Sequence, residues 1–255
     1  MTIRAVLFDF FGTLTQAVRR GPVHDEVARL LDCDPARWKA ALDRTFYLRA
    51  TGRLGDPIDV LDKLARSIGG RPTRKNLYIA YAARIGAIAA DGPLRPDAVA
   101  VLSALRERGL RTAVVSDCWY ELPLLIHRLP VAELLDATVF SVNLGRCKPD
   151  PALYLAACER LGVQPEQCLY VGDGGSRELS GAAEVGMTPI RLAAPDLAGH
   201  LAFVRDGWRG TEVTTLSEIP ARAYPLEAAR PGRRAYAQPH GPQRGRRRSA
   251  RTTGG

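Results

Sequence analysis

The spacing of short apolar segments constrains the fold of this chain more than any other feature. Five segments of six or seven residues are rich in β-branched and other apolar side chains, and each is bounded by polar residues or glycine. They are 3–8, 110–116, 137–142, 167–172 and 187–192. Helical patterns occur between them at 95–109, 150–162 and 176–186. Strands that alternate with helices predict an α/β fold, with a Rossmann-like parallel sheet and helices on both faces.

Residues 16–92 interrupt this alternation. This stretch has no convincing strand pattern, and four segments have the apolar spacing of amphipathic helices: 21–31, 34–50, 56–69 and 73–90. We therefore expect a helical domain over 16–92, inserted into an α/β core domain made of residues 1–15 and 93–220.

The charge of the chain is concentrated at its C-terminal end. Residues 221–255 contain nine arginines and one acid, so they carry +8 of the total formal charge of +9. They are rich in Arg, Pro and Gly and contain almost no aliphatic side chains, a composition typical of disorder. We expect a disordered, solvated tail and no nucleic-acid partner, unless the tail itself binds one, because no RNA-binding or zinc-finger pattern is present.

Two further features concern the cellular compartment. No apolar run approaches the roughly 20 residues that cross a bilayer, and the N-terminus lacks the pattern of a secretion signal. The five cysteines are odd in number and form no C-x-x-C pair, which favours reduced thiols. We expect a cytoplasmic monomer or homodimer with no membrane partner.

Polar side chains follow the first two predicted strands. Asp9 comes directly after residues 3–8, and Gly12 permits a tight turn, so the carboxylate is suited to act as a nucleophile; the alternative is an aspartate that caps a turn. Ser116 and Asp117 end the second segment. A hydroxyl and free backbone N–H groups there can hold an anionic oxygen, although the pair can equally cap the next helix.

Two more candidates lie further along the chain. Lys148 is one of only four lysines; Pro149 and Pro151 fix its loop, where it can neutralise an anion, or simply be a solvated loop residue. Asp173 and Glu178 follow the fourth strand in "VGDGGSRE". Carboxylates in such a loop suit Mg²⁺, and the alternative is an ordinary turn rich in Gly and Asp.

The order of these motifs in a parallel-sheet context resembles the haloacid dehalogenase (HAD) superfamily of aspartyl-nucleophile hydrolases. The resemblance covers about residues 3–195, and the helical insertion stands where this family carries its cap. The matching residues are Asp9 in "DFFGTL", Ser116 in "VVSD", Lys148 in "CKPDP", and Asp173 with Glu178 in "GDGGSRE".

The resemblance implies catalytic roles for three residues. Asp9 would form a covalent aspartyl intermediate, Ser116 would bind phosphoryl oxygens together with backbone amides, and Lys148 would offset the negative charge of Asp9. We also expect substrate contacts from the residues next to these motifs, namely Gly12, Thr13 and Asp117.

The resemblance also implies Mg²⁺ as the cofactor. Asp173, Asp9 and the backbone carbonyl of Phe11 would hold the ion, and Glu178 would support them through metal-bound water or by orienting its loop. The metal neutralises charge that would otherwise repel an anionic nucleophile.

Phe11 departs from the pattern of the family's phosphatases. They carry a second Asp at this position as general acid and base, whereas the family's 2-haloacid dehalogenases carry a tyrosine there and work without Mg²⁺. The "GDGGSRE" motif is of the metal-binding phosphatase type. We favour Mg²⁺-dependent hydrolysis of a phosphate ester or anhydride in a small anionic metabolite. The alternatives are dehalogenase-like carbon–halogen hydrolysis and a degenerate, non-catalytic binding protein.

Other side chains are candidates for the missing proton transfer or for substrate selection. Asp117, Asp25 and His24 are candidates for proton transfer, although we expect His24 on a solvated helix face. Residues of the helical insertion that are candidates for lining the substrate cavity, with core packing as the alternative for the aromatic ones, are Arg19, Arg20, Trp38, Phe46, Tyr47 and Arg49.

Overall fold

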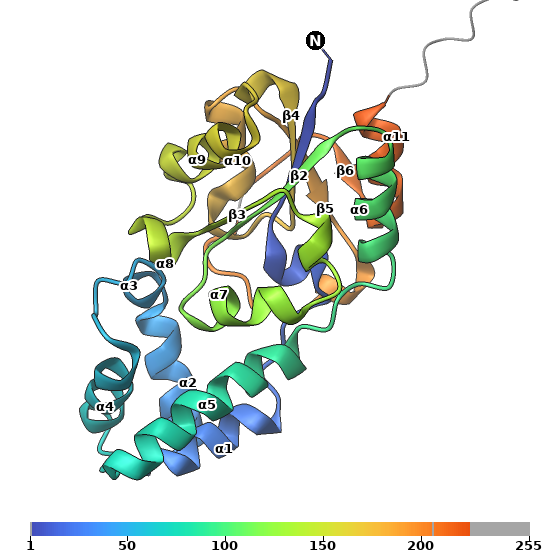
Figure 1. Cartoon of the computed structure of the whole chain (residues 1–255). Coiled ribbons are helices and arrows are strands. Elements are labelled where there is room, and N and C mark those ends of the chain that lie inside the picture. The colour runs from blue at the N-terminus through green and yellow to red at the C-terminus, as the bar shows by residue number, and fades with distance from the viewer. Residues whose placement is uncertain (1, 206, 225–255) are drawn as a thin grey trace, which may run out of the picture. The chain divides into compact units, whose positions relative to one another are not determined.

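A parallel sheet forms the centre of the protein. The computed structural model describes residues 2–205 and 207–224, and within them one sheet contains six strands in the order β3-β2-β1-β4-β5-β6 (Figure 1). The strands are β1 (Ala5–Phe8), β2 (Arg111–Ser116), β3 (Ala137–Phe140), β4 (Cys168–Gly172), β5 (Thr188–Leu192) and β6 (Glu212–Val213). The predicted α/β fold and its five strands are confirmed. The two residues of β6 are too short to produce a sequence pattern.

The first strand lies in the middle of this sheet. In the two parallel ladders Phe8 is paired with Val114 of β2 and with Val171 of β4. Strands β2 and β3 lie on one side of β1 and β4, β5 and β6 on the other, so the order of strands along the sheet reverses at β1. Open parallel sheets bind ligands at the carboxyl ends of the strands at such a reversal, and Asp9 is the first residue after β1.

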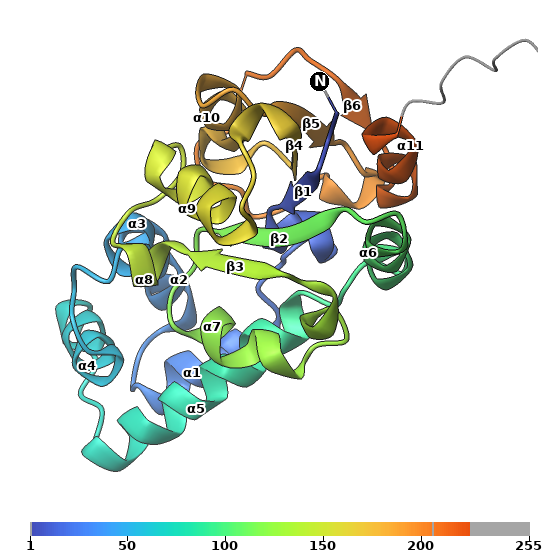
Figure 2. The same cartoon turned by 45° about the horizontal axis from the view of Figure 1, so that its top comes forward.

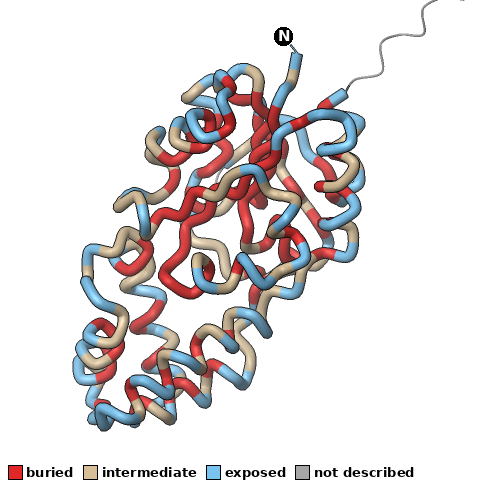
Figure 3. Tube along the Cα trace, in the orientation of Figure 1, coloured by how far each residue is buried: buried red, intermediate tan, exposed pale blue. Residues whose placement is uncertain are grey.

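Helices cover both faces of the sheet, and β1 shows why. Val6 and Phe8 belong to a core cluster with α6 (Ala98–Glu107) and α11 (Ile219–Ala223). Ala5 and Leu7 belong to a second cluster with α9 (Pro151–Leu161) and α10 (Glu178–Glu184). Successive side chains of a strand point to opposite faces, so a strand buried on both sides is apolar throughout. Figures 2 and 3 show the two helical layers and the buried strands between them.

Residues 16–92, between β1 and β2, contain helices and no strand, as expected. The helices are α1 (Pro22–Leu30), α2 (Pro35–Arg44), α3 (Phe46–Ala50), α4 (Pro57–Ser67) and α5 (Arg74–Asp91). The predicted single helix over 34–50 is two helices, because the backbone leaves helical geometry at Thr45 (φ −106°, ψ 10°). The insertion has an apolar cluster of its own around Trp38 and Leu61, which Trp119 and Tyr120 join from the loop after β2.

Short elements complete the chain. They are the helices α7 (Glu121–Leu125) and α8 (Ser141–Leu144), and one-turn helices at Ile126–Arg128, Ala132–Leu134, Pro165–Gln167, Gly175–Arg177, Pro195–Leu197 and Leu216–Glu218. Helix α11 includes the first three residues of the expected tail, so the folded part extends to Tyr224. The predicted disorder of 225–255 lies outside the described residues. Among the described helices, none is long and apolar enough to span a bilayer.

Candidate active site

The turn after β1 holds Asp9 at the carboxyl edge of the sheet. Residues Phe10–Leu14 form this turn, and Gly12 adopts φ +81°, a conformation that favours glycine. Thr15 Oγ1 accepts a hydrogen bond from Gly12 N at 3.0 Å. The buried Arg95 guanidinium donates to the carbonyl oxygens of Gly12 and Thr13, each at 2.9 Å. The turn is therefore fixed from both sides, and Asp9, only 5% exposed, is fixed with it.

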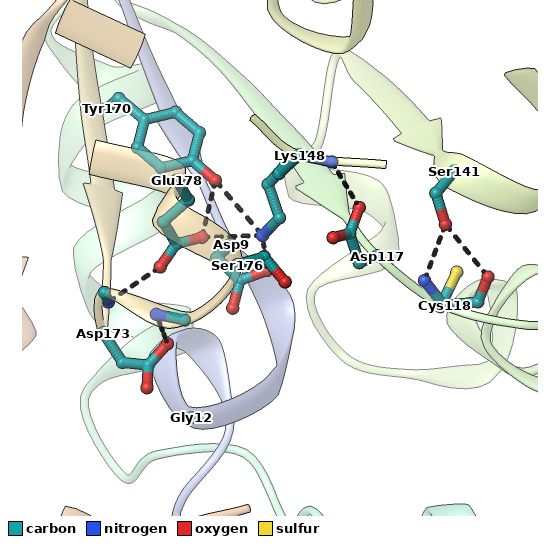
Figure 4. Close-up of polar contacts among 12 residues, drawn as sticks. Asp9, Gly12, Asp117, Cys118, Ser141, Lys148, Tyr170, Asp173, Ser176 and Glu178 are labelled. Carbon is teal, nitrogen blue, oxygen red and sulfur yellow. Dashed lines mark hydrogen bonds and ion pairs between the residues drawn. The ribbon is translucent and has the colours of Figure 1, made fainter. Parts of the chain in front are cut away.

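Lys148 joins two of the predicted site residues (Figure 4). Its Nζ lies 2.6 Å from Asp9 Oδ1 and 2.6 Å from Glu178 Oε2. Its backbone N–H donates to Asp117 Oδ1 at 3.0 Å, which fixes the loop that carries it. Burial alone would lower the pKa of Lys148, but the attraction of Asp9 and Glu178 outweighs burial and raises that pKa well above its ordinary value. The two carboxylates thus favour the charged form of Lys148.

Glu178 was expected only to support the metal ligands, but its carboxylate also accepts several hydrogen bonds within the site. Its Oε2 accepts from Tyr170 OH at 2.9 Å, and its Oε1 accepts from Gly174 N at 2.9 Å. The carboxylate packs so closely on Gly172 that a Cβ there would stand 2.2 Å from Oε1. Glu178 thus orients both Lys148 and the loop that carries Asp173.

Three carboxylates converge beside this lysine. Oxygen atoms of Asp9, Asp173 and Glu178 all lie within 4.8 Å of one another. Burial is the main cause that raises the pKa of Asp9 to about 6, of Asp173 to about 6 and of Glu178 to about 7. When ionised, the three carboxylates carry more negative charge than the neighbouring Lys148 can balance. This donor set fits Mg²⁺, which prefers a few carboxylate oxygens with water completing its octahedron.

His200 is a site residue that the sequence motifs do not reveal. Its Nδ1 accepts from Val18 N at 2.9 Å, so the neutral ring carries its proton on Nε2, which lies 3.7 Å from Asp173 Oδ2. The ring also packs on Gly12, where a Cβ would stand 2.6 Å from Nε2. Burial lowers the pKa of His200. His200 follows the one-turn helix Pro195–Leu197, outside every predicted motif, and no local pattern marks it.

The remaining predicted site residues differ in whether they line the cavity. Asp117 lines the cavity next to Lys148, and burial raises the pKa of its carboxyl group. Ser116 and Thr13 are fully buried, do not line the cavity, and have hydroxyls without a hydrogen-bond partner among the described residues. The loop after β2 is held instead by Ser141, whose Oγ accepts from Cys118 N at 2.9 Å. The substrate contacts of Ser116, Gly12 and Thr13 stay predictions.

A cavity of about 130 Å³ opens over Asp9 and is lined by both the sheet and the helical insertion. From the sheet side come Asp9, Phe11, Asp117, Lys148, Asp173, Glu178 and His200. Of the six candidates in the insertion, Arg20, Phe46 and Arg49 line the cavity. Trp38 is buried in the core of the insertion, Arg19 donates to the carbonyls of Asp196 and Ala198, and Tyr47 OH contacts Ser176 Oγ at 3.3 Å.

His24 is placed differently from the sequence expectation. It is 2% exposed and lines the cavity, so the expected solvated position is wrong. Its Nε2 lies 2.5 Å from Asp91 Oδ2, at the end of α5. Its neighbour Asp25 points elsewhere and pairs with Lys39 at 2.9 Å. The helix face of α1 that carries His24 is covered by α5, the element with which α1 packs most closely.

Known proteins resemble this chain in sequence. A family model described as haloacid dehalogenase-like hydrolase matches residues 3–186. A glyceraldehyde 3-phosphate phosphatase of Methanopyrus kandleri is 29% identical over 201 residues, which are 74% of this chain and 84% of the relative. An (S)-2-haloacid dehalogenase of Pseudomonas is 26% identical over 227 residues, which are 86% of this chain and 95% of the relative.

Solved structures share the fold. An L-2-haloacid dehalogenase of Xanthobacter autotrophicus, with chloropropionic acid covalently bound, has a TM-score of 0.61 at 21% identity and covers 89% of this chain and 100% of its own. A HAD-family enzyme of Bacteroides thetaiotaomicron, in complex with magnesium and inorganic phosphate, has a TM-score of 0.59 at 17% identity and covers 76% of this chain and 95% of its own.

Proposed function

The chain belongs to the haloacid dehalogenase-like hydrolase family, and from this premise we propose that it is a Mg²⁺-dependent phosphohydrolase of a small anionic metabolite. Asp9 is the nucleophile, and α1–α5 act as the cap that selects the substrate. The observation that carries the proposal is the position of Lys148 Nζ, 2.6 Å from Asp9 and 2.6 Å from Glu178, next to the carboxylate of Asp173. The phosphatase name of the Methanopyrus relative supports it.

The first chemical step is attack of an Asp9 carboxylate oxygen on phosphorus. A new O–P bond forms, the bond from phosphorus to the leaving oxygen breaks, and that oxygen leaves with the electron pair. Lys148 keeps Asp9 ionised and oriented and balances the charge of the aspartyl phosphate. Water then attacks phosphorus, releases inorganic phosphate and restores the Asp9 carboxylate. One difficult displacement is thereby divided into two easier ones.

Asp173 and Asp9 would hold the Mg²⁺ ion, with the Phe11 carbonyl as a further ligand, and Glu178 would orient them. When bound, Mg²⁺ supplies positive charge that offsets repulsion between the anionic nucleophile and a phosphoryl group. The side chain of Phe11 lines the cavity and cannot transfer a proton. Leaving groups of low pKa, such as those of acyl phosphates and anhydrides, need a general acid least. We therefore place the substrate in that class.

A panel of phosphomonoesters and acyl phosphates, assayed with Mg²⁺ and with EDTA, tests the proposal. We expect turnover that chelation abolishes and that the Asp9→Asn variant lacks. Mass spectrometry of trapped enzyme should show an aspartyl phosphate at Asp9. Turnover that is indifferent to EDTA contradicts the role of the metal, and the absence of any adduct or turnover contradicts catalysis and favours a binding protein.

A second candidate function is carbon–halogen hydrolysis of a short 2-haloacid, and Phe11 is the observation that favours it. A halide leaves without protonation, so such a reaction does not need a proton donor at position 11. The similarity to the Pseudomonas dehalogenase over 86% of this chain supports this candidate. Chloride release from 2-chloropropionate is the assay; no release across a series of short haloacids eliminates it.

A further inference from the structure

The wall of the cavity that the helical insertion contributes contains three arginines. Arg20, Arg49 and Arg84 all line it, from the segment before α1, from α3 and from α5. Arg49 and Arg84 are 4% and 3% exposed. Guanidinium groups remain charged and are costly to bury without a counter-charge. An arginine in this wall that lacks a carboxylate partner therefore indicates a place where an anionic ligand can bind.

Two of these arginines have carboxylate partners. Arg20 Nη1 lies 2.7 Å from Asp43 Oδ1. Arg84 binds Glu121 Oε1 through Nε and Nη2, but its Nη1 is buried and has no hydrogen-bond partner among the described residues. Arg84 therefore has one buried guanidinium nitrogen without a hydrogen-bond partner, in a residue that lines the cavity.

Arg49 has no acidic partner. Its Nη2 donates to the Leu42 carbonyl at 2.8 Å and its Nε to Thr45 Oγ1 at 3.2 Å, and no carboxylate of the described residues forms an ion pair with it. Burial, followed by the nearby charge of Arg84, lowers the pKa of Arg49 to about 9. The two neutral oxygens hold the Arg49 side chain in place, and its charge is opposed only by the charges of Glu121 and Asp43, which lie beyond ion-pair distance.

The Trp119 ring lies close to the guanidinium groups of both Arg49 and Arg84. Arg49 Cζ lies 5.2 Å and Arg84 Cζ 5.5 Å from the centre of the Trp119 ring, and Trp119 lines the same cavity. Aromatic contacts of this kind hold cations at defined positions. The cavity thus has an acidic side at the sheet, around Asp9, and a side at the insertion where His24 contacts Asp91 and where Arg49 is the one lining arginine without an ion-pair partner among the described residues.

From this arrangement we infer that Arg49 and Arg84 form a subsite for a second anionic group of the substrate, remote from the phosphoryl group that Asp9 attacks. The ligand class is a small molecule that carries a phosphate at one end and a carboxylate or a second phosphate at the other. A guanidinium fork matches both planar carboxylates and phosphates. The inference rests on the proposed function only for the identity of the group at Asp9.

Phosphonates test the subsite independently of turnover, because their carbon–phosphorus bond is not hydrolysed at Asp9. We would measure calorimetrically, with Mg²⁺ present, the binding of propylphosphonate, 3-phosphonopropionate and propane-1,3-bisphosphonate, and of the homologues with one methylene more or fewer. We expect at least one anion-ended series to bind roughly 10- to 100-fold more tightly than the neutral series, as for charge-assisted hydrogen bonds. The two anion-ended series distinguish a carboxylate from a second phosphate.

Variants assign that preference to a residue. Arg49→Met and Arg49→Gln should remove it; the glutamine retains a donor for the Leu42 carbonyl but not the charge. Arg20→Met is the matched control, since Arg20 lines the same cavity with its charge already paired, and it should keep the preference. The readout is a ratio between ligands on one preparation, so a loss of folded protein in one variant does not change it.

Two results would overturn the inference. One is wild-type protein that binds the anion-ended and neutral phosphonates equally at every chain length. The other is a preference that survives in both Arg49 variants. Failure of the proposed function gives a different result, namely no hydrolysis of the corresponding phosphate esters while the phosphonate preference and its dependence on Arg49 remain.

Discussion

Lys148 Nζ lies 2.6 Å from Asp9 Oδ1, and both side chains are less than a tenth exposed. The two residues are 139 positions apart in the chain. A buried lysine and a buried carboxylate stabilise one another, because each carries a large desolvation cost that the other helps to offset. The pair is thus important both for folding and for the reactivity of Asp9.

Removing the lysine should therefore destabilise the protein. We expect Lys148→Met to lower the free energy of unfolding by about 3–5 kcal/mol at pH 8, the cost of breaking a buried ion pair. The loss should be smaller at pH 5, where Asp9 and Glu178 can take up protons. Urea unfolding at both pH values measures this. Lys39→Met is the control, because its pair with Asp25 is partly exposed and exposed ion pairs contribute little to stability. Equal losses for the two variants contradict the prediction.

The three carboxyl groups make stability depend on pH. Their folded-state pKa values of about 6, 6 and 7 exceed the ordinary values of 3.8 and 4.5. The metal-free folded protein therefore binds more protons than the unfolded chain between about pH 4 and 7. The stability that Asp9, Asp173 and Glu178 contribute is complete below about pH 4 and is lost as the pH rises through 6 to 7.

Mg²⁺ should reverse this loss, because it binds the ionised carboxylates and competes with protons. We expect the increase in melting temperature caused by Mg²⁺ to be larger at pH 8 than at pH 5. Thermal unfolding with Mg²⁺ and with EDTA gives the comparison, and Asp173→Asn should lose the increase. A magnesium effect that is equal at both pH values, or that Asp173→Asn retains, argues against this site.

A proton-transferring group at position 11 should improve phosphate ester hydrolysis. Phe11 lines the cavity together with Asp9 and Asp173, so a carboxyl group on this residue is next to the reacting groups. General acid–base catalysis typically contributes 10²–10⁴-fold, and we expect Phe11→Asp to raise kcat on esters with poor leaving groups by roughly 10²-fold. Acyl phosphates should gain much less. If the esters gain nothing, our account of Phe11 is wrong.

The close approach of His200 to Gly12 gives a prediction with an internal control. Gly12→Ala puts a residue with a side chain into the left-handed backbone conformation (φ +81°), and its Cβ would stand 2.6 Å from His200 Nε2. Gly109→Ala has the same backbone strain (φ +77°) with nothing within 4 Å. We expect Gly109→Ala to cost about 1–2 kcal/mol of unfolding free energy, and Gly12→Ala to cost more and to reduce activity as well. Denaturant unfolding and kcat/KM are measured for both, and equal effects rule out a specific role of the contact.

Much of the fold follows from local patterns. The five longer strands are predictable because a strand between two helical layers is apolar along its whole length. The helix predicted over 150–162 is α9 (Pro151–Leu161), and Asp150 caps it by accepting a hydrogen bond from Ala152 N. The break at Thr45 was missed, because both halves of 34–50 continue the same amphipathic spacing.

The site was predictable only where a residue follows a strand or lies in a motif. Asp9, Asp117, Lys148, Asp173 and Glu178 all line the cavity. His24 was expected in solvent because its own helix sequence does not reveal that α5 covers it, and His200 follows no strand or motif. Ser116 at the end of β2 is fully buried and does not line the cavity, and its contact with the substrate stays a prediction.

Local patterns were enough to predict the order of strands and helices, the helical stretch between the first two strands, and the identity of the residues that follow the central strands. These depend on local periodicity, and on the rule that parallel strands end at one edge of a sheet. The fold alone reveals which polar side chains meet: Lys148 with Asp9 and Glu178, and His24 with Asp91, whereas Arg49 has no ion-pair partner among the described residues. Such pairings join residues far apart in the chain, and burial sets their energies, so no local pattern encodes them.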